Sequence, residues 1–221
     1  MRKTLVIATG NKGKLREYQK LLSELPFNIV SLDDVGISLE VEETGNTFSD
    51  NAWLKALTYS KLTGMLTLSD DSGLEVDALQ GQPGVHSARY GGESLTSDEE
   101  RVSLLLKNIE SVKWAKRTAR FKCVIAIAET KKAQSEQAEY ANQGSSEARP
   151  IASVVGSISG MIQYEPQGED GFGYDPVFYL PSIKQTMAEM TLEYKNLISH
   201  RSDASRKVIQ VLRSLAIRCN T

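Results

Sequence analysis

The stretch Ser69-Asp70-Asp71-Ser72-Gly73-Leu74-Glu75-Val76-Asp77 follows an apolar run, Met65 to Leu68, and places two carboxylates next to each other. Asp and Gly are poor strand formers, so the pattern predicts a strand that ends where the aspartates begin. Adjacent carboxylates repel unless a positive charge lies nearby, and a hard cation such as Mg²⁺ prefers such oxygen ligands. A solvated Asp-rich turn gives the same pattern. The rest of the chain must therefore supply the other parts of a metal and phosphate site.

The first apolar run, Thr4 to Thr9, has strand length and leads through a glycine-containing turn into a helix. Helix N-termini bind anions because their N–H groups are unpaired and the dipole is positive there. This turn is not a Walker P-loop, because Leu15 follows Lys14 where that motif needs Ser or Thr. A plain strand–helix connection is the alternative. The candidate anion-binding residues are Thr9, Gly10, Asn11, Lys12, Gly13 and Lys14.

A second helix is predicted from Thr47, a plausible N-cap with Asp50 three residues later, to about Thr63. Glu43 precedes the glycine turn before this helix, so its carboxylate is placed to reach a binding site. A solvated acidic face is the alternative for this charge run. Glu43 is therefore a candidate, not an assigned ligand.

The composition excludes several classes of protein. The chain has 221 residues, 40% of them hydrophobic and 24% charged, and its net charge is −2. We expect no nucleic-acid partner, because there is no basic excess, and no membrane partner, because no apolar run approaches about 20 residues. Two distant cysteines, Cys123 and Cys219, favour reduced thiols in a cytoplasmic protein.

The central part of the chain predicts further regular elements. Ser97 with Glu100 forms a capping box that begins a helix, and Thr118 to Glu129 alternates as a half-buried strand with Cys123 on its apolar face. Lys131 to Pro150 is polar and predicts an exposed hairpin insertion. A strand resumes from Ile151 to Ile162.

Two stretches near the C-terminus carry candidate ligand-binding residues. Gly171-Phe172-Gly173-Tyr174-Asp175-Pro176 is a glycine-rich loop whose aromatic rings could stack on a planar ligand or fill the core. Ser199 or Ser202 is expected to cap the last helix, which leaves His200 and Arg201 in its first turn. Cations oppose the helix dipole there, and this placement hints at a bound ligand. With only two histidines, zinc is not expected.

Together these segments closely resemble the inosine/xanthosine triphosphate pyrophosphatase family. The matches run in family order from about Thr4 to Leu212, and the set is specific although no single motif is. Asp50 stands where the family usually has Glu, and Ser69 where it usually has Ala. The matching segments are Ala8 to Lys14, Glu43-Thr44-Gly45, Thr47-Phe48, Asn51-Ala52, Lys55-Ala56, Asp70 to Leu74, Pro83-Gly84, Ser87 to Tyr90, Gly171 to Pro176, Lys195 and Ser199-His200-Arg201.

The resemblance implies an α/β fold, with a long central mixed sheet flanked by helices and two lobes that enclose the active-site cleft. It implies a single nucleoside-triphosphate pyrophosphatase domain over residues 1–221, with a polar insertion at about 131–150. The implied reaction is Mg²⁺-dependent hydrolysis of XTP, ITP or dITP to the monophosphate and pyrophosphate, by a cytoplasmic enzyme that is usually a homodimer.

The resemblance also implies roles for individual residues. Glu43 and Asp71 bind Mg²⁺, and Asp71 accepts a proton from the attacking water. Ser72 contacts the substrate, and Lys55, Asp70 and Arg89 are supporting candidates. The triphosphate is held by Thr9, Gly10, Asn11, Lys12, Gly13 and Lys14, and the base is framed by Phe172, Gly173, Tyr174, Asp175, Lys195, His200 and Arg201.

Two alternative functions stay open at this point. One is a pyrophosphatase for modified pyrimidine or other odd nucleotides on a similar fold. The other is a nucleotide-binding regulator without catalysis, which the intact Asp71, Glu43 and Lys14 disfavour.

Overall fold

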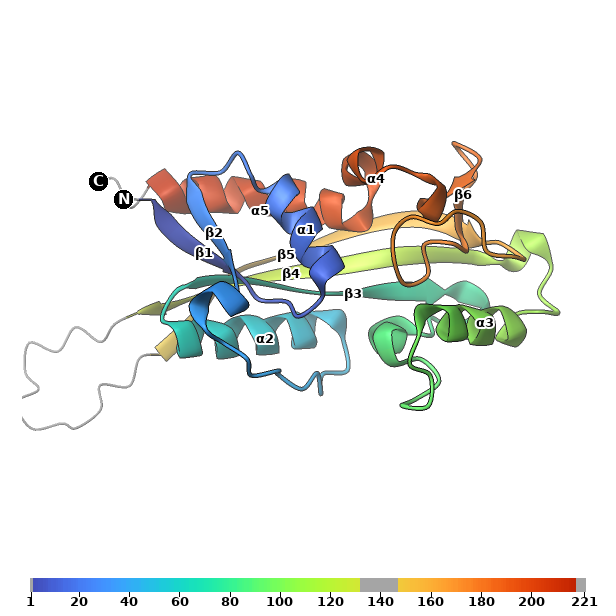
Figure 1. Ribbon diagram of the computed structural model, residues 1–221, viewed down its shortest axis with the longest axis horizontal. Helices are drawn as coiled ribbons and strands as arrows, with labels where there is room; N and C mark the ends of the chain where they lie inside the picture. The colour runs from blue at the N-terminus through green and yellow to red at the C-terminus, as the bar shows by residue number, and fades with distance from the viewer. Residues whose placement is uncertain (1, 132–146, 218–221) are drawn as a thin grey trace, which may run out of the picture. The chain divides into compact units, whose positions relative to one another are not determined.

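The computed structural model describes residues 2–131 and 147–217. They form an α/β fold with a seven-stranded mixed sheet and flanking helices (Figure 1), which confirms the predicted fold class. The strand order is β2-β1-β3-β4-β5-β6-β7. The strands are β1 (Lys3–Ile7), β2 (Phe27–Ser31), β3 (Leu66–Val76), β4 (Thr118–Lys131), β5 (Glu147–Ile162), β6 (Phe178–Leu180) and β7 (Gln185–Thr186). The α-helices are α1 (Lys12–Leu21), α2 (Phe48–Thr63), α3 (Asp98–Asn108), α4 (Leu192–Ile198) and α5 (His200–Ile217).

The chain divides into two compact units. Unit 1 comprises Met1–Asp71, Val124–Val154 and Ser205–Thr221, and unit 2 comprises Ser72–Cys123 and Val155–Ala204. The elements β3, β4, β5 and α5 each contribute residues to both units. The boundary within β3 falls between Asp71 and Ser72.

Unit 1 is organised around β1, which pairs in parallel with both β2 and β3. In Figure 1, α1 lies on one face of these strands and α2 on the other. Strands that are covered on both faces are continuous apolar runs, and Leu5, Val6 and Ile7 are accordingly buried. The chain enters α1 directly after β1, so the helix begins beside the carboxyl end of this strand.

Unit 2 has its own hydrophobic core. Val102 and Leu105 of α3, and Ile109 directly after it, belong to the same buried cluster as Phe121 of β4 and Phe178 of β6. The predicted capping box begins α3: Ser97 Oγ accepts a hydrogen bond from Glu100 N, and Glu100 accepts one from Ser97 N. Because this motif is local in sequence, the start of α3 is confirmed as predicted.

The prediction that the strand ends at the two aspartates is wrong. β3 continues through Asp70 and Asp71 to Val76. Tertiary contacts override the poor strand propensity of these residues: Lys14 pairs with Asp70, and Asn51 donates to Asp71. Further along, a Cβ on Gly73 would lie 2.3 Å from Ser87 Oγ, so glycine permits a close approach there.

The strands on both sides of the predicted insertion are longer than expected. β4 extends to Lys131, and β5 begins at Glu147 instead of Ile151. Residues 132–146, which make up most of the predicted insertion, lie outside the described residues. Cys123 is buried in β4, as expected. Within the described ranges, no helix is both long and apolar enough to cross a membrane.

Candidate active site

The turn between β1 and α1 has the features of an anion-binding site. Asn11 caps α1, because its side-chain oxygen accepts a hydrogen bond from Lys14 N at 3.0 Å. Thr9 Oγ1 accepts a hydrogen bond from Asn11 N at 3.2 Å, which stabilises the turn. Gly10 is exposed, and a Cβ there would meet nothing within 4 Å. The positive end of the α1 dipole is therefore presented beside open space, where an anion can approach.

Asp70 and Asp71 lie on opposite faces of β3, because successive side chains of a strand alternate. Asp70 Oδ2 lies 3.0 Å from Lys14 Nζ of α1, and Asp71 Oδ2 accepts a hydrogen bond of 3.0 Å from Asn51 Nδ2 of α2. Both aspartates are buried. The strand thus separates two neighbouring carboxylates, and each meets its own partner.

Asn51 connects Asp71 to the turn before α2. Its Oδ1 accepts a hydrogen bond of 2.7 Å from Gly45 N, while its Nδ2 donates to Asp71. A Cβ on Gly45 would lie 2.6 Å from Asn51 Oδ1, so the close approach requires glycine. Glu43, at the start of the same turn, forms an ion pair with Lys55 of α2. The turn and α2 therefore hold the two candidate metal ligands through two sets of polar contacts, one at Asp71 and one at Glu43.

The charges of this cluster do not balance. Glu43, Asp70 and Asp71 supply three carboxylates, whereas Lys14 and Lys55 supply two ammonium groups. Burial raises the pKa of Asp71, and Glu43 adds to this effect, while Lys55 and Lys14 oppose it. Burial would lower the pKa of Lys55, but Asp70, Asp71 and Glu43 outweigh burial and raise it. Lys55 therefore stays charged.

The residues present fit a hard divalent cation that keeps most of its own waters. In the part of the chain that the structure describes, no three His, Cys, Asp or Glu side chains form a ready cage for a metal. Mg²⁺ does not need such a cage, because it is commonly bound through one or two carboxylates plus water and phosphate oxygens. Asp71 and Glu43 offer two carboxylates of this kind.

The glycine-rich loop of unit 2 is held at Asp175. This buried carboxylate accepts hydrogen bonds through Oδ2 from Phe172 N, at 2.9 Å, and from Lys195 Nζ of α4, at 2.6 Å. Gly171 has a φ of +85°, and a Cβ there would lie 2.2 Å from Asp175 Oδ2. The glycine thus allows the loop to fold tightly over the carboxylate.

The two aromatic rings of the loop have different surroundings. Phe172 is half-buried, with Lys195 Nζ 4.7 Å and the Arg201 guanidinium 5.7 Å from its ring centroid. Tyr174 belongs to the hydrophobic core, and its hydroxyl donates to the Ser87 carbonyl at 2.9 Å. Burial raises the pKa of Tyr174 well above its ordinary value. Phe172 is therefore the ring of this loop that lies beside the candidate cations.

His200 and Arg201 are buried in the first turn of α5, where the sequence placed them. His200 stacks on Phe121 with ring centroids 4.8 Å apart, and Arg201 donates to Ser72 Oγ at 3.1 Å. Of the two predicted caps, Ser199 is the one that accepts a hydrogen bond from Ser202 N. The structure thus brings Phe172, Asp175, Lys195, Arg201 and Ser72 together within unit 2.

The sequence analysis did not single out Asp98, and it named Asn51 only within a matching segment, without a role. Asn51 is a fully buried polar residue on the apolar side of α2, between Phe48 and Ala52, and that position is a usable signal. Asp98, in the first turn of α3, accepts a hydrogen bond from Gly173 N at 2.6 Å. The two residues are 75 positions apart in the sequence, so no local sequence pattern predicts this contact.

The fold is α/β, and its clusters combine a capped helix N-terminus with neighbouring carboxylates and lysines. A family model described as the Ham1 family matches residues 5–211, and the chain belongs to this family.

Its relatives and structural neighbours are similar to it over nearly the whole length of the chain. A dITP/XTP pyrophosphatase of Desulforamulus reducens is 47% identical, with 96% of this chain and 97% of the relative covered. A dITP/XTP pyrophosphatase of Bacillus subtilis is 39% identical, with 95% of this chain and 97% of the relative covered. The structure of a HAM1 protein from Coxiella burnetii has a TM-score of 0.79 and 38% identity, covering 96% of this chain and 99% of that one. The crystal structure of a nucleoside-triphosphatase, dITP/XTP pyrophosphatase, from Mycobacterium abscessus has a TM-score of 0.67 and 35% identity. The match covers 95% of this chain and 98% of that one.

Proposed function

We propose that the protein hydrolyses deaminated purine nucleoside triphosphates, namely XTP, ITP and dITP, to the nucleoside monophosphate and pyrophosphate. The observation that carries the proposal is the carboxylate–lysine cluster of unit 1, whose carboxylates suit a metal ion and whose lysines suit a triphosphate. Relatives named dITP/XTP pyrophosphatase, 39–47% identical over nearly full length, support the choice of substrate.

In this proposal the α1 turn binds the triphosphate through Thr9, Gly10, Asn11, Lys12, Gly13 and Lys14. Asp71 and Glu43 hold Mg²⁺, which when bound supplies positive charge against the phosphates and orients their oxygens. Asp71 also accepts the proton of the attacking water. Asn51, donating to Asp71 Oδ2, keeps the carboxylate oriented for this role.

The base is recognised by residues of unit 2. Phe172 offers a ring face for stacking, and Gly173, Tyr174 and Asp175 give the loop its shape. Lys195, His200 and Arg201 are donors for the 6-oxo group of hypoxanthine or xanthine, where adenine carries an amino group. Because these side chains are buried, an unmatched base would leave polar groups unpaired, which is costly. Ser72, held by Arg201, contacts the substrate.

The test is pyrophosphate release from ITP, XTP, GTP and ATP, with and without Mg²⁺, and from dUTP and dTTP derivatives. We expect fast, metal-dependent release from ITP and XTP only. Preference for the pyrimidines would overturn the substrate assignment, and equal rates on all purines would remove the base-recognition roles. Tight binding of ITP with Mg²⁺ but no pyrophosphate would instead show a binding-only protein.

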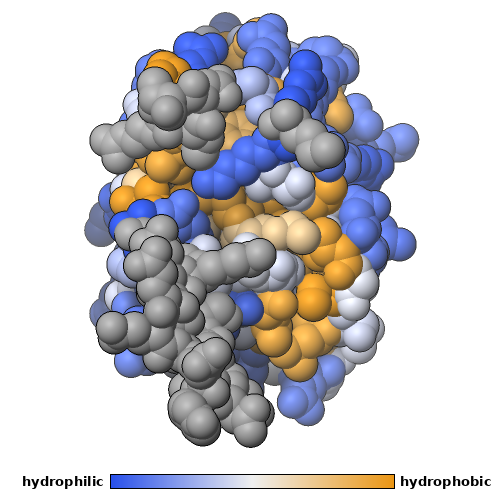
Figure 2. Space-filling view, turned by 90° about the vertical axis from the view of Figure 1, so that its left-hand side faces the viewer, coloured by the Kyte–Doolittle hydropathy of each residue, from blue (hydrophilic) through white to orange (hydrophobic). Residues whose placement is uncertain are grey.

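We also propose that the enzyme is a cytoplasmic homodimer. Figure 2 shows hydrophobic residues gathered on part of one face, and gathered apolar surface is typical of protein contacts. Among the exposed large hydrophobic residues of unit 1 are Leu62 and Met65. Sedimentation equilibrium should give twice the chain mass of 24.4 kDa, and a monomer at micromolar concentration would contradict this.

A further inference from the structure

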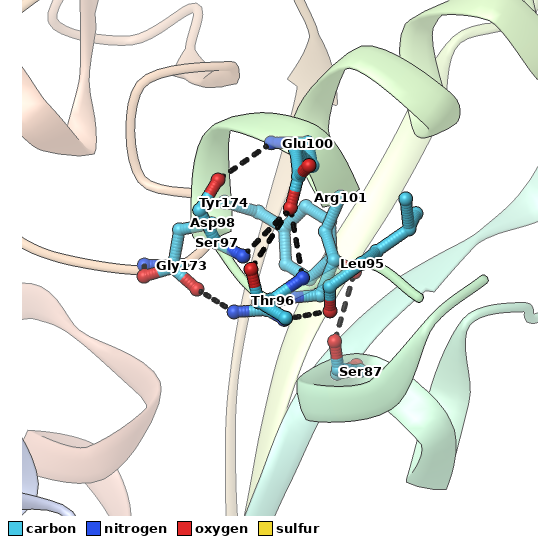
Figure 3. A network of polar contacts seen from close by, with 9 residues as sticks. All are labelled: Ser87, Leu95, Thr96, Ser97, Asp98, Glu100, Arg101, Gly173 and Tyr174. Carbon is cyan, nitrogen blue, oxygen red and sulfur yellow. Dashed lines mark hydrogen bonds and ion pairs between the residues drawn. The ribbon is translucent and has the colours of Figure 1, made fainter. Parts of the chain in front are cut away.

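The first turn of α3 is attached to the glycine-rich loop of unit 2 by one carboxylate (Figure 3). Asp98 Oδ2 accepts a hydrogen bond from Gly173 N at 2.6 Å. Its other oxygen, Oδ1, lies 2.7 Å from a guanidinium nitrogen of Arg101, one helical turn later. Each oxygen of Asp98 thus has its own donor, and the contact with Gly173 is a charge-assisted hydrogen bond.

The beginning of α3 is well placed to hold this carboxylate still. Glu100 accepts hydrogen bonds from Thr96 N, at 2.8 Å, and Ser97 N, at 3.0 Å, which closes the capping box before Asp98. Arg101 donates from its second guanidinium nitrogen to the Leu95 carbonyl at 3.0 Å. The Asp98 carboxylate therefore projects from a capped helix end and is paired to an arginine that is itself anchored.

The side of the loop that faces α3 is attached differently from the side held by Asp175. Gly171 and Gly173 both have positive φ, which glycine adopts freely and which does not by itself fix the backbone. On the α3 side, the loop borders a cavity of about 400 Å³, lined by Gly171, Phe172, Gly173 and the α3 residues Val102 and Leu106. A cavity lacks the atoms that would hold the loop by packing. The Asp98–Gly173 hydrogen bond is thus the polar connection to α3 at the residue next to Phe172.

We propose that Asp98 is a positioning residue for purine recognition, an inference that rests on the proposed function. By holding Gly173 N, Asp98 keeps the Phe172 ring beside Lys195 and Arg201, where the ring stacks on the base. Other contacts join the loop to itself and to its other neighbours: Asp175 accepts hydrogen bonds from Phe172 N and from Lys195 Nζ, and Tyr174 donates to the Ser87 carbonyl. None of these contacts joins the loop to α3, which is what the Asp98–Gly173 hydrogen bond does.

The experiment compares Asp98→Ala and Asp98→Asn with the control Glu99→Ala. Glu99 is the exposed neighbour that lines the same cavity, so its removal changes the helix end by a similar charge. For Asp98→Ala we expect the KM for ITP to rise about tenfold, kcat to change less than about twofold, and selectivity for ITP over ATP to fall. An asparagine oxygen still accepts a hydrogen bond from Gly173 N, so the KM of Asp98→Asn should lie close to that of wild type. Glu99→Ala should behave as wild type.

Hydrogen exchange of the Gly173 amide, measured without nucleotide, provides a readout independent of activity. We expect loss of protection in Asp98→Ala and retention in Asp98→Asn and Glu99→Ala. Unchanged protection and unchanged KM in Asp98→Ala would overturn the proposal, as would equal changes in Asp98→Ala and Glu99→Ala. If the wild type releases no pyrophosphate from ITP, the proposed function fails, and the Gly173 exchange alone then decides whether Asp98 holds the loop.

Discussion

Asp71 carries a charge in surroundings that disfavour it. Burial raises its pKa, so the ionised side chain destabilises the folded state, and this cost appears as the pH rises through the folded-state pKa. A group that lowers stability while supplying a carboxylate to a site is typical of functional residues. Activity and stability are therefore expected to respond in opposite directions when Asp71 loses its charge.

Replacing Asp71 with Asn should lower pyrophosphate release by at least about 10³-fold, because the proton acceptor and a metal ligand are lost. The free energy of unfolding at pH 7 without metal should equal or exceed that of wild type. The variant leaves Glu43 and Asp70 opposite Lys14 and Lys55, and Asn can still accept from Asn51. Urea unfolding and a pyrophosphate assay check both effects.

Asp77→Asn is the matched control, since Asp77 follows β3 and its exposed carboxylate contacts Thr118 and Arg120. Near-wild-type turnover is expected for it. If Asp71→Asn kept a near-normal rate, Asp71 would have no part in the mechanism, and a loss of more than about 1 kcal/mol of stability would contradict the charge argument.

At the scale of elements, β3 depends on a glycine. Ser87 Oγ accepts from Leu74 N at 2.9 Å and donates to the Gly84 carbonyl at 2.7 Å, directly against Gly73. A methyl group on Gly73 would lie 2.3 Å from Ser87 Oγ and 2.6 Å from the Gly84 carbonyl oxygen. The second contact is with backbone, so rotating one side chain does not relieve it.

Gly73→Ala is therefore expected to lower the free energy of unfolding by about 1–3 kcal/mol, as overpacking does in well-packed interiors. Chemical denaturation measures the change. Gly10→Ala is the control, because a Cβ there meets nothing within 4 Å and stability should stay within about 0.5 kcal/mol of wild type. Equal stabilities of the two variants would show that β3 does not need the close approach.

Glu129 of β4 gives a pH-dependent prediction. Burial opposes its charge, but the hydrogen bond from Arg149 and the attraction of Lys3 outweigh burial and lower its pKa below 4.5. A depressed folded-state pKa means that the stabilisation is present above the unfolded-state pKa and is lost as the pH falls through the folded-state value. Glu129→Gln should thus cost about 0.5–1 kcal/mol at pH 7.

Urea unfolding of wild type and Glu129→Gln at pH 7 and at successively lower pH tests this. The difference between them should shrink once the pH falls below about 4.5, the ordinary glutamate value. A difference that stays constant down to pH 2 would show that the charge of Glu129 is not its cause.

The contrast between local and distant contacts explains which elements the sequence predicts. Thr47 with Asp50 and Ser97 with Glu100 cap their helices through contacts three residues apart, so short motifs predicted them correctly. The continuation of β3 depends on partners such as Lys14 and Ser87, which lie elsewhere in the chain. Propensity alone therefore predicted a turn where the folded protein has a strand.

At the scale of the whole molecule, four elements belong to both units. A strand that loses its hydrogen-bonding neighbours in one unit is weakened in the other, because its residues form one continuous ladder. We expect a single unfolding transition in calorimetry, with equal calorimetric and van't Hoff enthalpies. Gly73→Ala, in unit 2, should shift the entire transition. Two separate transitions, only one of which moves in Gly73→Ala, would contradict this.

The sequence predicts some residues of the candidate site but not the contacts that orient them. Its chemical residues stand in recognisable motifs, such as Asp70-Asp71 and Ser199-His200-Arg201. The orienting roles of Asn51, which stands in a matching segment, and of Asp98, which does not, could not be predicted, because a polar side chain in a helix gives no sign of which distant atom it contacts. The distinction between Phe172 and Tyr174 likewise needs the three-dimensional packing, since both are aromatic residues of one loop.

The alternation of side chains along β3 has a practical consequence for engineering the protein. Even-numbered Asp70 and Ser72 each meet a cation, Lys14 and Arg201 respectively, whereas odd-numbered Asp71 and Gly73 meet Asn51 and Ser87. A mutant library restricted to the even positions would vary the side chains that contact Lys14 and Arg201, and one restricted to the odd positions would vary the residues that contact Asn51 and Ser87. Four consecutive codons thus offer two separable sets of variants.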